Sequence, residues 1–252
     1  MVDEKKQMTG DAEATRGNDR RVRVGVIFGG RSGEHEVSLM SARSVIDALD
    51  AEKYEVVPIG ITARGQWLTG DAYGALTSGD AAAARPATLL PDPQASALMS
   101  VKQEPAMPAS LSEVAHLDVV IPILHGPFGE DGTVQGLLEL AGLPYVGSGV
   151  VGSAVGMDKA IFKHVMAANG VPILPWRLVL AGDWRKQRMA LVNELEACFE
   201  YPVFTKPANL GSSVGISRCA NREELEQGID TAAEFDRRIV VEQGINAREL
   251  EV

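Results

Sequence analysis

The chain is 252 residues long, which is enough for a sizeable core and for two domains. Hydrophobic residues make up 45% and charged residues 23% of it, a composition that excludes a disordered or fibrous protein. The formal net charge of −10 argues against nucleic acid or an anionic membrane as the main partner. A local basic pocket for phosphates remains compatible with this charge.

The cysteines and the N-terminus indicate the compartment. Cys198 and Cys219 lack the spacing of a metal motif, which excludes a disulfide-dense secreted scaffold and a structural zinc finger. Residues 1–21 contain no apolar core stretch, so they predict a disordered tail and no signal peptide. The apolar runs, such as residues 119–124, are too short to span a bilayer. We therefore expect a cytoplasmic protein with reduced cysteines.

The first elements in the chain predict a parallel sheet. Residues 22–28 form a β-rich run that is closed by two glycines, and apolar residues at helical spacing follow over 39–49. Residues 54–62 predict the next strand, so a right-handed crossover joins two parallel strands. Residues 66–68 predict a short edge strand.

The middle of the chain is less regular. Residues 72–109 are rich in Ala, Pro, Gly and Ser, which predicts a long surface insertion or a ragged hairpin with little structure. Residues 117–124 are nearly all apolar, as expected of a strand that is buried on both faces. A helix at 133–140 and a short strand at 144–146 complete this half.

The pattern changes after Gly147. Residues 153–170 predict two short helices around Asp158 and Lys159. Further strands are predicted at 176–180, 203–206, 215–218 and 238–242, with helices at 184–199 and 222–234. Residues 248–252 look like the opening of another strand, and a sheet cut there leaves open ladder groups. We expect a chain that stops inside a domain, as a fragment or the start of a longer protein.

The first candidate site is GGRSGEHEVS, residues 29–38, at the carboxyl end of the first strand. Glycines permit a tight turn there, and ligands of open α/β sheets lie outside such strand ends. The spacing is not that of the dinucleotide fingerprint. Glu34 is a candidate for holding a substrate ammonium, although a helix-dipole role for Glu34 and Glu36 is an equal alternative.

The second candidate site is LHGPFGEDGT, residues 124–133, which also follows an apolar strand. Its glycines and proline fix a shaped loop. His125 stands where the strand ends, so a ligand role competes with that of a packed or capping residue. Asp131 is interpreted as a cap of the following helix.

The third candidate site is KPANLGSSVG, residues 206–215. Backbone N–H groups freed by Gly211, beside the hydroxyls of Ser212 and Ser213, are suited to binding an anion, and Lys206 adds a point charge. The motif is not a Walker A loop, because no GK[ST] opens a helix. An ordinary hairpin loop is the alternative, but the combination favours phosphate binding.

Two weaker features also fit a nucleotide. Lys159 lies near the start of a helix, and residues 240–245 form a strand that runs into a loop whose backbone can read an adenine edge. Glu242 could accept the exocyclic N–H of adenine, and Glu249 the ribose hydroxyls. Taken singly, each is more typical of a surface residue. The sequence contains no HExxH, no GxSxG and no Cys–His pair, so metalloproteases and Ser or Cys hydrolases are not indicated.

Together these segments resemble the D-alanine–D-alanine ligases, which are ATP-grasp enzymes of peptidoglycan precursor synthesis. The similarity covers residues 22–252 and rests on four motifs, at 29–38, 124–159, 206–218 and 240–252. It implies an α/β fold with an N-terminal Rossmann-like (pre-ATP-grasp) parallel-sheet domain, followed by the first part of an ATP-grasp fold. The implied domains are residues 22–147, with an insertion at 72–109, and residues 148–252.

The resemblance also implies a reaction. ATP, with Mg²⁺ or Mn²⁺, phosphorylates the carboxylate of one D-alanine, and the amine of a second D-alanine attacks the acyl phosphate. This fits the motifs, because the charge on a transferring phosphoryl group needs cations and backbone donors. The family precedent further implies a homodimer, with small-molecule substrates as partners.

The resemblance assigns roles to individual residues. Glu34 matches the residue that holds the ammonium of the first D-alanine, His125 lies near its carboxylate, and Ser212 bonds across the site to Glu34. The nucleotide contacts that it implies are Lys159, Lys206, Gly211, Ser212, Ser213, Glu242, Gln243, Ile245 and Glu249. Relatives often carry lysine at position 243, but that contact is made by the backbone.

The family's ω-loop, its oxyanion arginine and its metal ligands would lie beyond Val252, so we expect no metal ligand and no ligase activity in this chain alone. The residue that separates amine from hydroxyl acceptors lies there too. A D-alanine–D-lactate ligase, or another ATP-grasp ligase, therefore remains an alternative. So does a non-catalytic module that binds nucleotide or amino acid. The coding sequence downstream of Val252 would discriminate between enzyme and module.

Overall fold

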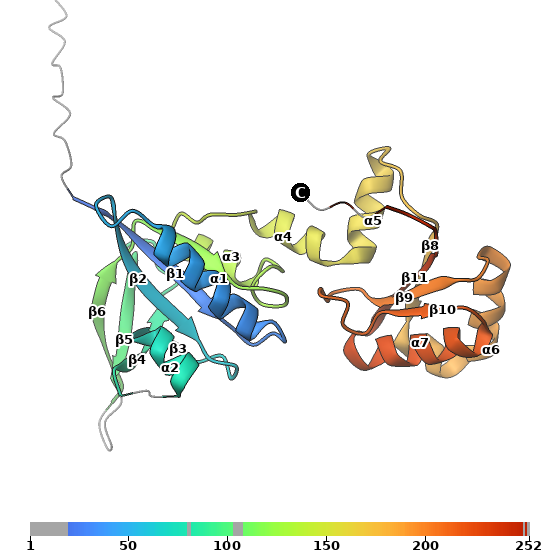
Figure 1. Ribbon diagram of the computed structural model, residues 1–252, viewed down its shortest axis with the longest axis horizontal. Helices are drawn as coiled ribbons and strands as arrows, with labels where there is room; N and C mark the ends of the chain where they lie inside the picture. The colour runs from blue at the N-terminus through green and yellow to red at the C-terminus, as the bar shows by residue number, and fades with distance from the viewer. Residues whose placement is uncertain (1–19, 80–81, 103–107, 249, 251–252) are drawn as a thin grey trace, which may run out of the picture.

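The computed structural model describes residues 20–79, 82–102, 108–248 and 250. These residues form two sheets of different construction, which lie at opposite ends of the molecule (Figure 1). Helices α4 (Val150–Met157) and α5 (Lys159–Ala168) lie between the sheets. All of the predicted N-terminal tail except Arg20 and Arg21 lies outside the described residues.

The first sheet is parallel where the sequence predicts it. Strand β1 (Val22–Gly29) lies between β2 (Tyr54–Ile61) and β7 (Val119–Ile123), and it is parallel to both. Helix α1 (His35–Ala48) makes the crossover from β1 to β2. Because parallel strands end at the same edge, the glycine turn after β1 and the loop after β7 become neighbours.

The rest of this sheet is antiparallel. The remaining strands are β3 (Trp67–Gly70), β4 (Ala84–Leu89), β5 (Ala97–Lys102) and β6 (Ser110–His116), and α2 (Ala72–Ser78) follows β3. The predicted edge strand is therefore internal, since β3 pairs with β2 and β4. Residues 72–109 also hold more structure than predicted. Their inward side chains include small residues such as Ala87 and Ala97, which hide the alternation that marks a strand.

Strand β7 lies at an edge of the sheet, and it packs on both faces as predicted. Val120 is fully buried in one core, whereas Val119, Ile121 and Ile123 are partly buried against the other. The predicted strand at 144–146 is reduced to one parallel bridge between Tyr145 and Val120. Helix α3 (Thr133–Leu140) packs on one face of the sheet through Leu138, whereas α1 packs on the other through Leu39.

The second sheet is antiparallel, with the order β10-β9-β11-β8. Its strands are β8 (Trp176–Leu180), β9 (Val203–Pro207), β10 (Ser217–Cys219) and β11 (Arg238–Gln243), and its helices are α6 (Ala181–Cys198) and α7 (Arg222–Phe235). Helices α6 and α7 cover one face, and α5 lies on the other (Figure 1). Residues 248 and 250 are not in a strand, and the rest of the last predicted strand lies outside the described residues.

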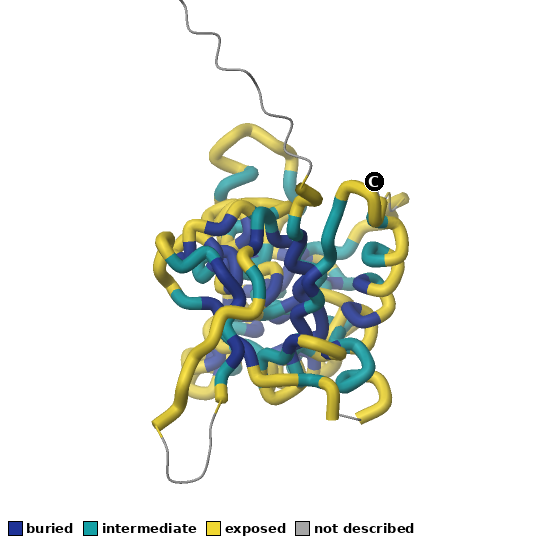
Figure 2. The backbone as a smooth tube through the Cα atoms, turned by 90° about the vertical axis from the view of Figure 1, so that its left-hand side faces the viewer, coloured by how far each residue is buried: buried dark blue, intermediate teal, exposed yellow. Residues whose placement is uncertain are grey.

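Strand alternation sorts the side chains of the second sheet. Ile239 and Val241 in β11 face α6 and α7, where Trp184 and Ile229 complete a buried core. Val240 faces α5 instead and packs with Ala160. Buried residues form cores in both parts of the molecule. Figure 2 shows buried segments in dark blue at the centre of the view, with exposed segments around them. No helix among the described residues is both long and apolar enough to cross a membrane.

Candidate substrate and nucleotide site

The turn after β1 is fixed by close backbone packing at Gly29 and by hydrogen bonds of Ser38. Gly29 has a φ of 86°, and a Cβ added to it would lie 2.3 Å from the carbonyl oxygen of Ile61, so only glycine fits. The buried Ser38 hydroxyl accepts a hydrogen bond from the Gly29 N–H at 2.8 Å and donates one to the carbonyl of Ile123. The turn is thereby fixed to the ends of both β1 and β7.

The side chain of Glu34 is not engaged by its own helix. It occupies the N-cap position of α1, but its side chain makes no capping hydrogen bond to that helix. Its carboxylate instead accepts a hydrogen bond from the hydroxyl of Ser212, which lies 178 residues away in the sequence. This contact favours the ligand role of Glu34 over the helix-dipole alternative.

The loop after β7 is shaped by hydrogen bonds to its own carboxylates. Asp131 accepts hydrogen bonds from the N–H groups of Phe128 and Thr133, both at 2.9 Å, so it caps the start of α3 from the residue before the N-cap. Glu130 accepts one from the Gly126 N–H at 2.7 Å. Among the described residues, the buried Nε2 of His125 has no hydrogen-bond partner. A polar atom in that state is available to a ligand.

The Gly/Ser loop after β9 adopts an unusual backbone conformation. Ser212 and Ser213 have φ angles of 47° and 59°, in the left-handed region that residues other than glycine seldom occupy. Asn209 anchors the start of the loop, because its N–H and its side-chain amide both donate to Asp236, at 2.9 and 2.8 Å. Such strain is typical of a functional loop, and the turn presents backbone N–H groups to an anion.

These three segments meet at Glu34. A Cβ added to Gly126 would lie 3.1 Å from Glu34 Oε2, and one added to Gly211 would lie 3.9 Å from the same atom. A cavity of about 580 Å³ adjoins the junction. Its wall includes Glu130, Ser153, Lys159, Gly211, Ser212 and Ser213. The predicted substrate turn and the predicted phosphate loop therefore lie side by side.

Lys159 enters this cavity from the start of α5. Its N–H donates to the Ala208 carbonyl at 2.9 Å, and its ammonium donates to the Leu210 carbonyl. Burial lowers the pKa of Lys159, and repulsion by Lys206 lowers it further. Asp158 fixes the helix start, because its carboxylate caps α5 and pairs with Arg238. Lys159 is thus a cation attached to the predicted phosphate loop.

Glu242 lies between two lysines on the face of the second sheet that packs against α5. Its side chain is 7% exposed, and it pairs with Lys163 at 2.8 Å and with Lys206. Burial raises the pKa of the Glu242 carboxyl, but the hydrogen bonds from both lysines bring it below its ordinary value. Sequence reasoning missed Lys163. The available signal was its position four residues after Lys159, on the same face of the helix.

The remaining residues predicted to contact adenosine lie at the end of β11 and in the segment that follows it. The side-chain amide of Gln243 accepts from the Glu200 N–H at 3.0 Å and donates to the Glu200 carbonyl at 2.8 Å. Its backbone N–H donates to the Pro175 carbonyl at 3.0 Å, so a nucleotide contact by Gln243 falls to its backbone carbonyl. Ile245 is 56% exposed, and Glu249 lies outside the described residues.

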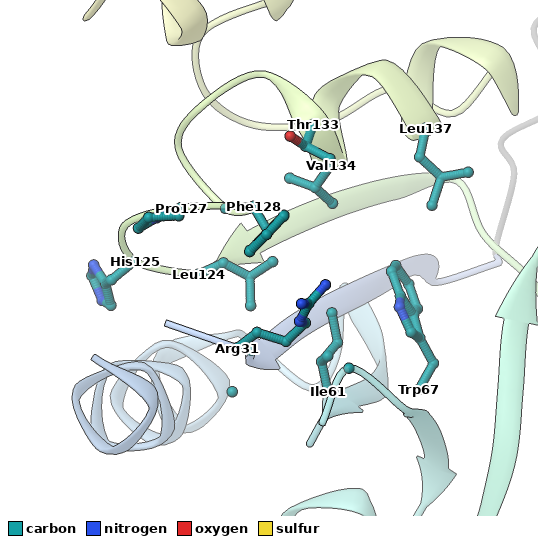
Figure 3. Close-up of a pocket in the computed structure, with 14 residues that line it drawn as sticks. Arg31, Ile61, Trp67, Leu124, His125, Pro127, Phe128, Thr133, Val134 and Leu137 are labelled. Atoms are coloured by element: carbon teal, nitrogen blue, oxygen red, sulfur yellow. The ribbon is translucent and has the colours of Figure 1, made fainter. Parts of the chain in front are cut away.

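A second, smaller cavity of about 250 Å³ lies beside the His125 loop (Figure 3). Its wall is mostly apolar and includes Trp67 and Leu137. The guanidinium of Arg31 stacks over the ring of Phe128 at 4.5 Å, and His125 also lines the cavity. The sequence did not predict this cavity.

The fold and the site together define a class of protein. An α/β module with glycine-rich turns, followed by an antiparallel sheet that carries lysines and a Gly/Ser loop, is the arrangement of ATP-grasp proteins. A family model described as "D-ala D-ala ligase N-terminus" matches residues 23–148, and one described as "D-ala D-ala ligase C-terminus" matches residues 165–252. The chain belongs to the D-alanine–D-alanine ligase family.

Individual relatives agree. The chain is 45% identical over 239 residues to a D-alanine–D-alanine ligase of Natranaerobius thermophilus, with 92% of this chain and 62% of the relative covered. It is 48% identical over 236 residues to one of Kineococcus radiotolerans, with 91% and 62% covered. The chain thus spans about 62% of the length of these curated relatives.

Solved structures show the same fold. The VanG D-Ala:D-Ser ligase from Enterococcus faecalis matches with a TM-score of 0.77 and 33% identity, over 90% of this chain and 64% of that one. The D-alanine–D-alanine ligase from Coxiella burnetii matches with a TM-score of 0.73 and 32% identity, over 89% and 62%. The predicted α/β architecture, with an ATP-grasp sheet in second place, is confirmed.

Proposed function

We propose that the protein carrying this chain joins two D-alanine molecules in an ATP-dependent reaction, for peptidoglycan precursor synthesis in the cytoplasm. The observation that carries the proposal is the hydrogen bond from Ser212 to Glu34. It supports a single site in which an amino acid and a triphosphate lie next to each other, as an acyl-phosphate reaction requires. The division into domains at residues 147 and 148, and the homodimer, belong to the same proposal.

The residues of the site fit the first half of that reaction. Glu34 holds the ammonium of the first D-alanine, and His125 donates to its carboxylate through the N–H at the buried Nε2. The ammonium groups of Lys159 and Lys206, with backbone N–H groups of the 211–213 loop, hold the phosphates of ATP. A carboxylate oxygen then attacks the γ-phosphorus to form the acyl phosphate, and ADP leaves.

The second half is the transfer itself. The amine of the second D-alanine attacks the acyl carbon, loses a proton and expels phosphate. Mg²⁺ or Mn²⁺ would neutralise charge on the triphosphate. However, the described residues contain no group of three or more His, Cys, Asp or Glu side chains that could hold a metal ion. We therefore assign no step of the reaction to a metal in this chain.

A second candidate function differs from the first in its second substrate. The similarity to the VanG D-Ala:D-Ser ligase favours an acceptor other than D-alanine as that alternative. Both candidates share the first D-alanine, so the roles of Glu34 and His125 are the same in each. A full-length protein offered D-alanine alone, or D-alanine with D-serine or D-lactate, distinguishes them by the product formed.

Calorimetric titration of the chain with Mg·ATP, D-alanine and L-alanine tests the proposal. We expect Mg·ATP and D-alanine to bind, and L-alanine to bind at least about tenfold more weakly, because both charged ends of the ligand are held and the mirror-image methyl group is misplaced. A chain that binds no nucleotide, or that does not distinguish the enantiomers, would contradict the proposal. Phosphate release by the full-length protein separates a ligase from a non-catalytic module.

A further inference from the structure

The pairing of Glu242 has a consequence for nucleotide binding. Its carboxylate is 7% exposed and has two cationic partners from different elements, Lys163 on α5 and Lys206 on β9. The Lys163 side chain is 15% exposed and that of Lys206 is 25% exposed. One buried negative charge is therefore shared by two positive charges, one more than neutrality requires.

Removing the last cation from a buried carboxylate costs much free energy, because an uncompensated charge in a site of low dielectric is strongly unfavourable. If Lys206 were the sole partner of Glu242, its movement to a phosphate would leave that carboxylate buried without a cation. Lys163 removes this obstacle, since it keeps Glu242 paired after Lys206 has moved. The mobile partner is then the more exposed of the two lysines.

The surroundings of Lys163 hold it in place for this role. Helix α5 starts at a carboxylate, Asp158, which caps the Ala160 and Ile161 N–H groups at 3.0 and 2.9 Å and pairs with Arg238. The same helix packs through Ala160 against Val240, two residues before Glu242. The position of Lys163 is thereby fixed relative to β11 from both sides of the contact.

We propose that Lys163 is a positioning residue that keeps the Glu242 carboxylate paired. Lys206 can therefore leave this carboxylate and bind a nucleotide phosphate. The inference rests on the proposed function, because it presumes a phosphate for Lys206 to reach. It assigns Lys163 no contact with the nucleotide.

A double-mutant cycle, measured by calorimetric titration with Mg·ATP, tests the inference. Lys163→Met is expected to weaken nucleotide binding by about tenfold or more, because Lys206 then remains bound to Glu242. In the Glu242→Gln background the same substitution should change the Mg·ATP affinity by less than about twofold, because the side chain at position 242 then carries no negative charge that needs a partner. Lys163→Arg should preserve most of the affinity. Lys186→Met, an exposed lysine on α6, is the matched control.

The outcomes separate the possibilities. An equal loss in both backgrounds would overturn the inference, because Lys163 would then contact the nucleotide directly or serve packing alone. No loss in Lys163→Met would also overturn it. If that variant does not fold, Lys163→Gln carries the same comparison. An unsubstituted chain that binds no nucleotide would overturn the proposed function, and this inference with it, whereas normal binding without coupling would overturn the inference alone.

Discussion

Replacing Lys206 by methionine is expected to weaken binding of Mg·ATP by about 50-fold while leaving D-alanine affinity unchanged. The substitution removes a charged hydrogen-bond donor to phosphate, which typically contributes about 1.5–3 kcal/mol. Glu242 keeps Lys163 as a partner at 2.8 Å, so the chain should still fold. Nucleotide and D-alanine titrations of the same preparation measure both affinities.

The exposed Lys186 on α6 provides the control for Lys206, because Lys186→Met removes the same charge outside the site. We expect it to change nucleotide affinity by less than about twofold, as is usual for an isolated surface charge. A similar loss in both variants would indicate a general effect of net charge. A normal affinity in Lys206→Met would remove this lysine from the nucleotide site.

Replacing Glu34 by glutamine is expected to weaken D-alanine binding by about 100-fold, with little effect on nucleotide affinity. A carboxylate paired with an ammonium in a partly buried site is lost, and such charged contacts are worth about 3 kcal/mol. Ser212→Ala should weaken D-alanine binding by a smaller factor of about five to ten, because Glu34 keeps its charge but loses its positioning partner.

Glu36 provides the matched control for Glu34. It lies two residues further on, in the first turn of α1, and it is exposed. Glu36→Gln should therefore leave D-alanine affinity within about twofold of the unsubstituted chain. If Glu34→Gln weakened D-alanine and nucleotide binding equally, Glu34 would have a structural role, and the assignment of the ammonium site would be wrong.

The parallel part of the fold was predictable because its signals are local. Two apolar runs predict β1 and β2 to within one residue of their observed bounds, and apolar residues at helical spacing over 39–49 predict α1, which begins four residues earlier, at His35. Residues 84–116 lack such signals. Their strands are stabilised by pairing along the sheet, as between Ser100 and Ser112, whose hydroxyls bond at 2.8 Å. Contacts of that kind leave little trace in one strand's own sequence.

The site was predictable as three separate motifs but not as an assembly from residue types alone. Glu34 and Ser212 are far apart in the sequence, and only the resemblance to a family placed them together, as the structure does. The supporting contacts were missed, among them the buried Ser38 and the Asp158–Arg238 pair. These polar residues look like ordinary surface residues in the sequence, because their partners are brought to them by the fold.

The structure of the chain crystallised with D-alanine and a non-hydrolysable ATP analogue is the most direct measurement of the central claim. We predict that both ligands occupy one cavity, with the D-alanine ammonium within hydrogen-bond distance of Glu34. The terminal phosphate should lie against the backbone of residues 211–213, facing the D-alanine carboxylate. Ligands bound in two separate cavities, or a 211–213 loop that lies away from Glu34 when both are bound, would contradict it.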